Sequence, residues 1–194
     1  MSGAKAIRTV AMSEAAAHGA CAICTVLRHY QTQLVEVTGL PTVTCLCNHH
    51  AWLLARSAPA ALAGQIYAQV LEAQHKPEPG KEHGCAFCVE LRREEKVRLD
   101  ELVQRMRVPA FAQWMRRSGT LCLWHADRLS NRLPEARPIV DEILARTIEE
   151  LKEDLRKCVA NSDREQHSIG GGVLGRVAEY LVCQRGIPGE ETPC

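Results

Sequence analysis

Eight cysteine and histidine side chains fall into four short motifs whose spacing suits metal coordination. A C-x2-C motif occurs at 21–24 and again at 85–88, and a C-x-x-H motif occurs at 47–50 and again at 122–125. Side chains three residues apart at the start of a helix lie on one face, about one turn apart. Three thiolates and one imidazole form a common tetrahedral set for structural zinc. The residue types therefore indicate metal binding.

The four motifs are two copies of one unit. "CAICTVLR" (21–28) matches "CAFCVELR" (85–92) at an offset of 64, and "LCNHHAWLLARSAP" (46–59) matches "LCLWHADRLSNRLP" (121–134) at an offset of 75. The second copy therefore carries 11 more residues between its motifs. Because both motifs recur in the same order, the pattern indicates internal duplication.

The simplest ligand assignment places one zinc ion in each copy, two per chain. The two predicted sets are Cys21, Cys24, Cys47 with His50, and Cys85, Cys88, Cys122 with His125. Cys45 and His49 have no counterpart in the second copy, where Thr120 and Trp124 stand. They are expected outside the ligand set, although substitution of one as a ligand stays open. An iron–sulfur cluster is the alternative cofactor, because short cysteine spacing serves both.

The remaining cysteines and two histidines have weaker roles in this scheme. Cys158 and Cys183 are expected as buried helical thiols, and Cys194 as a thiol in the tail. His18 and His83 precede the cysteine pairs and are expected in solvent-facing loops, with alternative ligation left open.

Hydrophobic periodicity predicts an all-α fold. Between the motifs of the second copy, Leu91, Leu99, Leu102 and Met106 recur at spacings that build one helical face, and Pro109 ends that run. Further helices are expected to end before Pro59 and Pro134 and to cover about 60–75, 110–117, 137–159 and 173–184. Alternation typical of strands is lacking, and 34–46 is the one place for a short strand or extended loop.

The domain organisation follows from the two copies. We expect a first helical unit at 1–75, a linker at 76–84, a second helical unit at 85–160, and a loop, final helix and tail at 161–194, all in one compact domain.

Composition excludes several classes of protein. The 194 residues carry a formal net charge of +1 and are 46% hydrophobic, which is typical of a globular chain rather than a disordered one. No apolar run is long enough to span a bilayer, and no signal peptide is recognised. The chain is therefore expected in the reducing cytoplasm, where clustered cysteines hold metal or do redox work.

Other cysteine chemistries fit less well. The C-x-x-C-H of haem attachment, the βαβ setting of thioredoxin-like pairs and the H-x-E of zinc deaminases are missing. The leading hypothesis is a non-enzymatic adaptor or regulatory protein with two zinc sites, whose partner is another protein. A redox protein with iron–sulfur clusters or a zinc–thiolate switch is the alternative.

Two further functions are weaker. An enzyme with an open metal position would use Asp127, two residues after His125, as its acid. Nucleic-acid binding would use 92–137, which has ten Arg and one Lys against six acids, but this mixed charge suits a solvated helix face better.

The order of motifs resembles an uncharacterised bacterial family of about this length. Its members repeat a unit of C-x2-C, a helical stretch and (G)-x-C-x-x-H, matched here by "CAIC", "LCNHH", "CAFC" and "SGTLCLWH". The closing part, "LKEDLRKCVANSDREQHSIGGGVLGRVAEYL", is similar to the family's long helix, turn and final helix. The resemblance implies Cys/His metal sites on an all-helical frame and implies no substrate.

Overall fold

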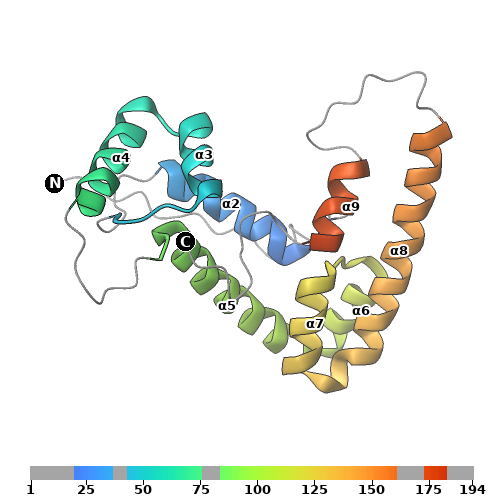
Figure 1. Ribbon diagram of the computed structural model, residues 1–194. Helices are drawn as coiled ribbons and strands as arrows, with labels where there is room; N and C mark the ends of the chain where they lie inside the picture. Colours follow the sequence, from blue (N-terminus) through green and yellow to red (C-terminus); the bar gives the residue numbers. More distant parts are fainter. Residues whose placement is uncertain (1–19, 37–42, 76–83, 161–172, 183–194) are drawn as a thin grey trace. The chain divides into compact units, whose positions relative to one another are not determined.

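The described part of the chain is helical. The computed structural model describes residues 20–36, 43–75, 84–160 and 173–182, and no strand occurs among them (Figure 1). The helices are α2 (Ala22–Glu36), α3 (Asn48–Ser57), α4 (Ala60–His75), α5 (Ala86–Met106), α6 (Pro109–Ser118), α7 (Leu123–Arg132), α8 (Arg137–Ala160) and α9 (Val173–Val182), with a 3-10 turn η1 (Pro134–Ala136). The predicted all-α fold class is confirmed.

Helix α5 buries the apolar face that its sequence predicts. Leu91, Leu99, Leu102 and Met106 are all buried, and their spacing of three, four and eight residues keeps them on one side. Glu95 lies on the same face and is also buried, at 3% exposure. Arg93, Lys96 and Asp100 on the opposite side are exposed, so the helix is held by packing of its apolar face rather than by propensity alone.

Proline and glycine mark the limits of α6. Val108 is its extended N-cap and Pro109 opens the helix, where a missing N–H costs nothing. Gly119 ends it, with its N–H donating to the carbonyl of Met115 at 2.8 Å. Proline thus separates α5 from α6, as its position in the sequence predicts.

Residues 34–46, predicted to form a short strand or an extended loop, are partly helical and partly irregular. Helix α2 continues through Glu36, and residues 43–47 have no regular secondary structure. Residues 37–42, most of the predicted linker at 76–84, the loop at 161–172 and the tail at 183–194 lie outside the described residues.

The chain divides into two compact units that differ from the two sequence repeats. Of the described residues, unit 1 contains 27–36, 43–75 and 84–95, and unit 2 contains 20–26, 96–160 and 173–182. The division falls inside α2 and α5. Each of these helices therefore contributes one end to each unit.

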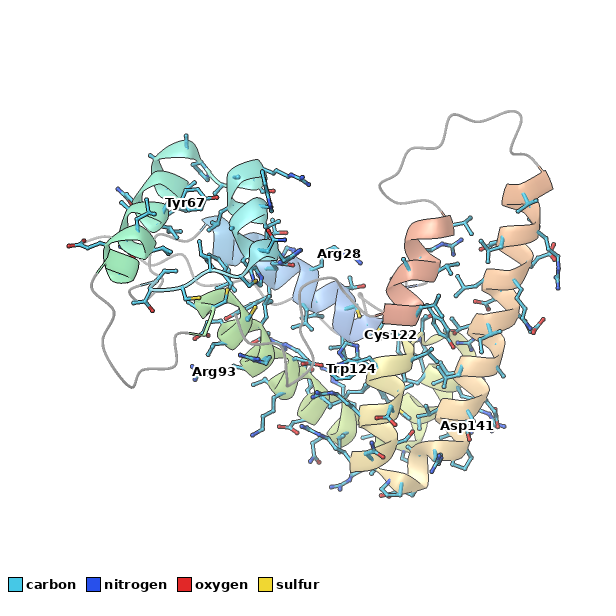
Figure 2. All side chains as sticks on the ribbon, viewed as in Figure 1. Arg28, Tyr67, Arg93, Cys122, Trp124 and Asp141 are labelled. Carbon is cyan, nitrogen blue, oxygen red and sulfur yellow. The ribbon has the colours of Figure 1, made fainter. Side chains whose placement is uncertain are left out.

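Unit 1 is built around the starts of α3 and α5. Its core joins Leu34, Leu54, Ile66, Phe87 and Leu91, all of them nearly inaccessible to solvent. Helices α3 and α4 are in contact, and the hydroxyl of Tyr67 on α4 donates to the carbonyl of Ala51 on α3 at 2.6 Å (Figure 2).

Unit 2 is a helical bundle. Helix α8 contacts α6, α7 and α9, and α7 also contacts α9 (Figure 1). Met115, Leu129 and Ile143 are fully buried between these helices. This packing fixes the start of α7, where the second C-x-x-H motif stands.

Candidate metal centres

Each of the four motifs begins at the N-cap of a helix. Cys47 and Cys122 have nearly identical backbone angles, with φ of −73° and −76° and ψ of 161° and 162°. Their carbonyls accept the first intrahelical hydrogen bond, from Ala51 and Ala126, both at 3.0 Å. Cys21 and Cys85 occupy the same position before α2 and α5. The second ligand of each motif is therefore the third residue of its helix.

N-cap and third helical positions bring two side chains together over the helix start, as in a capping box. In each motif both positions carry a metal-binding side chain. The partial positive charge of the helix N-terminus also favours thiolates there. Two such helix starts are enough to supply four ligands.

The structure brings the eight predicted residues into two groups of four. The Cys21 cluster consists of Cys21, Cys24, Cys122 and His125, and the Cys47 cluster consists of Cys47, His50, Cys85 and Cys88. In each group all four candidate ligand atoms lie within 4.8 Å of one another. The Cys21 cluster lies in unit 2 and the Cys47 cluster in unit 1.

The predicted pairing within each sequence repeat is wrong. The first C-x2-C joins the second C-x-x-H, and the second C-x2-C joins the first C-x-x-H. The physical reason is the helix that follows each C-x2-C. Rising about 1.5 Å per residue, it carries the chain away from the cysteines that begin it. The 21 residues of α5 therefore carry the chain from unit 1 into unit 2 before Cys122 is reached.

In the Cys21 cluster, the imidazole of His125 faces all three sulfurs. Its Nδ1 lies 3.3 Å from Cys21 Sγ, 3.5 Å from Cys24 Sγ and 3.1 Å from Cys122 Sγ. The sulfurs of Cys24 and Cys122 are 3.7 Å apart. Figure 2 shows Cys122 at the start of α7.

The Cys47 cluster repeats this geometry. Nδ1 of His50 lies 3.1 Å from Cys47 Sγ, 3.5 Å from Cys85 Sγ and 3.3 Å from Cys88 Sγ. The sulfurs of Cys47 and Cys88 are 3.6 Å apart.

These separations fit a single tetrahedral ion. Zinc bonds of about 2.3 Å to sulfur and about 2.0 Å to nitrogen place sulfurs about 3.8 Å apart and sulfur and nitrogen about 3.5 Å apart. The observed sulfur–sulfur distances of 3.6–3.7 Å agree closely, and the sulfur–nitrogen distances of 3.1–3.5 Å are equal to this value or shorter. Both groups can hold a metal ion.

The thiols of each cluster interact electrostatically. Burial raises the pKa of Cys21, but hydrogen bonds from Cys122 and Cys24 and the charge of His125 hold it well below its usual value. In the other cluster a hydrogen bond from Cys88 lowers the pKa of Cys85 to about 3, and that same bond and burial raise the pKa of Cys88. Burial also raises the pKa of Cys47.

Gln31 and Phe87 support the imidazole of His50. The amide nitrogen of Gln31 lies 3.3 Å from Nε2 of His50 and 3.2 Å from Nε2 of His49. Phe87 stacks on the His50 ring, with centroids 5.3 Å apart and an interplanar angle of 18°. These contacts fix the ring with Nδ1 toward the sulfurs.

The Cys21 cluster borders a small cavity in unit 2. The cavity measures about 20 Å³, room for about one water molecule, and is lined by Ala20, Cys21, Thr120, Cys122, Thr147, Leu151, Arg176 and Tyr180. The hydroxyl of Tyr180 is buried there, and desolvation followed by the nearby Cys122 raises its pKa.

The structure also places the other residues that the sequence singles out. Cys45 and His49 are half-buried and belong to neither cluster. Asp127 is exposed, accepts a hydrogen bond from Asn131 at 3.1 Å, and is not part of the Cys21 cluster. His18, His83, Cys183, Cys194 and the side chain of Cys158 lie outside the described residues.

Sequence reasoning missed the residues that surround the clusters. Gln31, Phe87 and Tyr180 carry no motif, so only the folded chain shows that they contact or border a ligand. One feature of the sequence could have indicated which C-x-x-H motif joins which C-x2-C motif. The predicted helix after Cys88 is long enough to carry the chain away from Cys85 and Cys88 before the next C-x-x-H motif is reached.

No helix in the described part of the chain is both long and apolar enough to cross a membrane. Comparisons of this chain with protein-family models, with curated proteins and with solved structures find no match.

Proposed function

We propose that this is a zinc protein with one ion in each cluster, two per chain, and that the ions serve structure rather than catalysis. One observation carries the proposal: three sulfurs and one Nδ1 converge twice, at separations suited to one tetrahedral ion. Both sets fill all four positions with side chains, which is typical of structural sites, whereas catalytic sites keep a position for water or substrate.

The compactness of the clusters favours single ions over iron–sulfur clusters. Such clusters distribute their ligands over several irons separated by sulfide. Four ligand atoms within 4.8 Å of one another enclose only one ion. We therefore expect the pure protein to be colourless.

We further propose that the protein acts as an adaptor or regulator whose partner is another protein, in a reducing compartment such as the cytoplasm. The seven cysteines whose side chains the structure describes form no disulfide bond with one another, which suits that compartment. Several arginines of the basic stretch are paired with acids within unit 2, including Arg98 with Glu101 and Arg116 with Glu142. This neutralisation disfavours nucleic acid, so labelled oligonucleotides at low salt should show no saturable binding.

Metal analysis tests the zinc proposal. Protein purified anaerobically should contain two zinc ions per chain, and replacement by Co²⁺ should give the intense visible bands of tetrahedral thiolate coordination. Visible charge-transfer bands of iron and sulfide in the purified protein, or the absence of bound metal, would contradict the proposal.

Matched double variants test the ligand sets. Cys24→Ser with Cys122→Ser removes two ligands of one structural cluster, and one zinc should remain. Cys24→Ser with Cys47→Ser removes one ligand from each cluster. In the presence of a competing chelator, this variant should retain no tightly bound zinc. Pairing within the sequence repeats gives the opposite result, because the second variant would then damage only one site.

A further inference from the structure

The two clusters differ in their exposure to solvent. Every ligand of the Cys21 cluster is buried, with Cys21 the most exposed at 3%. In the Cys47 cluster, His50, Cys85 and Cys88 are equally buried, but Cys47 is half-buried. One ligand of this cluster is thus open to attack from solvent.

The exposed ligand also has neighbours that bind metals. Cys45 lies two residues before Cys47 in the irregular segment 43–47, and it is half-buried as well. His49 is half-buried, and its ring lies 5.0 Å from that of His50. A thiol and an imidazole therefore stand within two residues of the open ligand.

The second copy replaces these neighbours with side chains that do not bind metals. The position of Cys45 is taken by Thr120, which is buried at 8% exposure. The position of His49 is taken by Trp124, whose ring is covered by Arg128 at 4.2 Å. The cavity beside the Cys21 cluster has room for about one water molecule.

We infer that the Cys47 cluster is an exchangeable metal site, through which a zinc ion enters and leaves, while the ion of the Cys21 cluster is permanent. The inference rests on the proposed function. In the exchange step the metal–sulfur bond at Cys47 breaks and a bond forms to Cys45 or His49, from which an incoming chelator takes the ion. The released Cys47 thiolate takes up the proton that Cys45 loses, or a proton from solvent where His49 binds, and no electrons are transferred. The incoming ligands are metal chelators that bear thiols or amines.

Zinc release from the loaded wild-type protein tests this assignment. With excess chelator and a chromogenic zinc indicator, one zinc per chain should leave at least about tenfold faster than the other. The Cys24→Ser/Cys122→Ser variant keeps the Cys47 cluster and should show only the fast phase. The Cys85→Ser/Cys88→Ser variant should show only the slow phase.

Alkylation of the loaded wild-type protein needs no variant that might unfold. Mass spectrometry after brief iodoacetamide treatment should find Cys45 and Cys47 labelled and Cys21, Cys24 and Cys122 protected. A Cys45→Ala/His49→Ala variant should keep two zinc ions, but the rate of its fast phase should fall several-fold. His29→Ala, which removes an exposed histidine of α2, is the matched control and should leave both phases unchanged.

The outcomes separate this inference from the proposed function. A wild-type protein without zinc overturns the proposed function itself. Two zinc ions that leave at equal rates, a fast phase that belongs to the Cys21 cluster, or an unchanged rate in Cys45→Ala/His49→Ala overturns the exchange site alone.

Discussion

At the scale of single residues, the candidate ligands occupy positions that most helices give to capping side chains. An N-cap serine, threonine or aspartate accepts a hydrogen bond from a helix N–H. Cys47 and Cys122 make no such side-chain cap. Their sulfurs instead face the other candidate ligands, and the positive ends of two helices would offset the excess negative charge of three thiolates around a bound divalent ion.

Gln31 should tune the metal affinity of one cluster only. With an ion on Nδ1 of His50, Nε2 carries the ring proton, and rotation of the Gln31 amide places its oxygen there as acceptor. We expect Gln31→Ala to weaken zinc binding at the Cys47 cluster by about 10–100-fold. Competition titration against a chelator of known affinity measures this.

The matched control is Gln33→Ala on the same helix. Gln33 contacts His29, which belongs to neither cluster, at 2.6 Å. Equal loss of affinity in both variants would show that Gln31 has no specific role in orienting His50.

Gly119 should resist substitution for lack of space. A Cβ there would lie 2.8 Å from the backbone oxygen of Met115 and 2.6 Å from its sulfur. The sulfur can move but the carbonyl cannot, so Gly119→Ala should lower the free energy of unfolding by about 1–3 kcal/mol in a denaturant titration.

Gly64 provides the opposite case. It lies in α4, and a Cβ added at this position would meet no atom within 4 Å. Gly64→Ala should therefore raise stability by about 0.5–1 kcal/mol. If both alanine variants shifted stability in the same direction, the steric explanation for Gly119 would fail.

The sequence was sufficient to find the clustered residues but not their surroundings. The constant offset between the copies favours Cys47 over Cys45 and His50 over His49, and the folded clusters contain the favoured residues. Gln31 and Phe87 could not be found this way, because a glutamine or phenylalanine in a helix has many possible neighbours. Only the packing of α2 and α5 in unit 1 selects His50.

At the scale of elements, Arg146 of α8 holds the end of α6. Its guanidinium donates to the carbonyl of Arg116 at 2.5 Å and also to the carbonyl of Gly119. Carbonyls at a helix end lack intrahelical partners, and a cation there is favourable. The contact fixes the chain three residues before Cys122.

Replacing Arg146 by Met should therefore destabilise unit 2. The variant keeps the apolar stem but removes two charge-assisted hydrogen bonds, and we expect a loss of about 1–3 kcal/mol in chemical denaturation. Arg156→Met removes only an exposed ion pair with Glu153 and should change stability by less than about 1 kcal/mol. Similar losses in both would mean that Arg146 acts only as a surface charge.

Helices were predictable from the sequence because proline and apolar spacing act locally. Pro59, Pro109 and Pro134 separate helices as expected. The pairing of the motifs was not predictable by the same reasoning. It joins Cys21 to His125 across 104 residues, and such a contact depends on where α2 and α5 lead the chain.

At the scale of the whole molecule, the two clusters are nested along the chain. The pairing of 47–50 with 85–88 lies inside the pairing of 21–24 with 122–125. Each cluster closes its own unit, and α2 and α5 have one end in each unit. Loss of one ion should consequently loosen one unit first.

Hydrogen exchange measures this. In Cys24→Ser/Cys122→Ser, amide exchange should rise in α6–α9 of unit 2 and change less in α3 and α4 of unit 1. In Cys85→Ser/Cys88→Ser the pattern should be reversed. A uniform increase over both units in either variant would show that the ions stabilise one cooperative structure.

The nested order has a consequence for the growing chain on the ribosome. Cys21, Cys24, Cys47 and His50 are all synthesised before Cys85, which follows His50 by 35 residues. Protein synthesis adds about 5–20 residues per second, so about 2–7 s pass between the synthesis of His50 and that of Cys85. Three thiols and one imidazole are already present throughout this time. During this interval the only available set is the non-native one. If the chain binds zinc as proposed, an ion captured by this set would have to be released before the native clusters form. Zinc that binds only after Cys88 and His125 have been synthesised would avoid this kinetic trap.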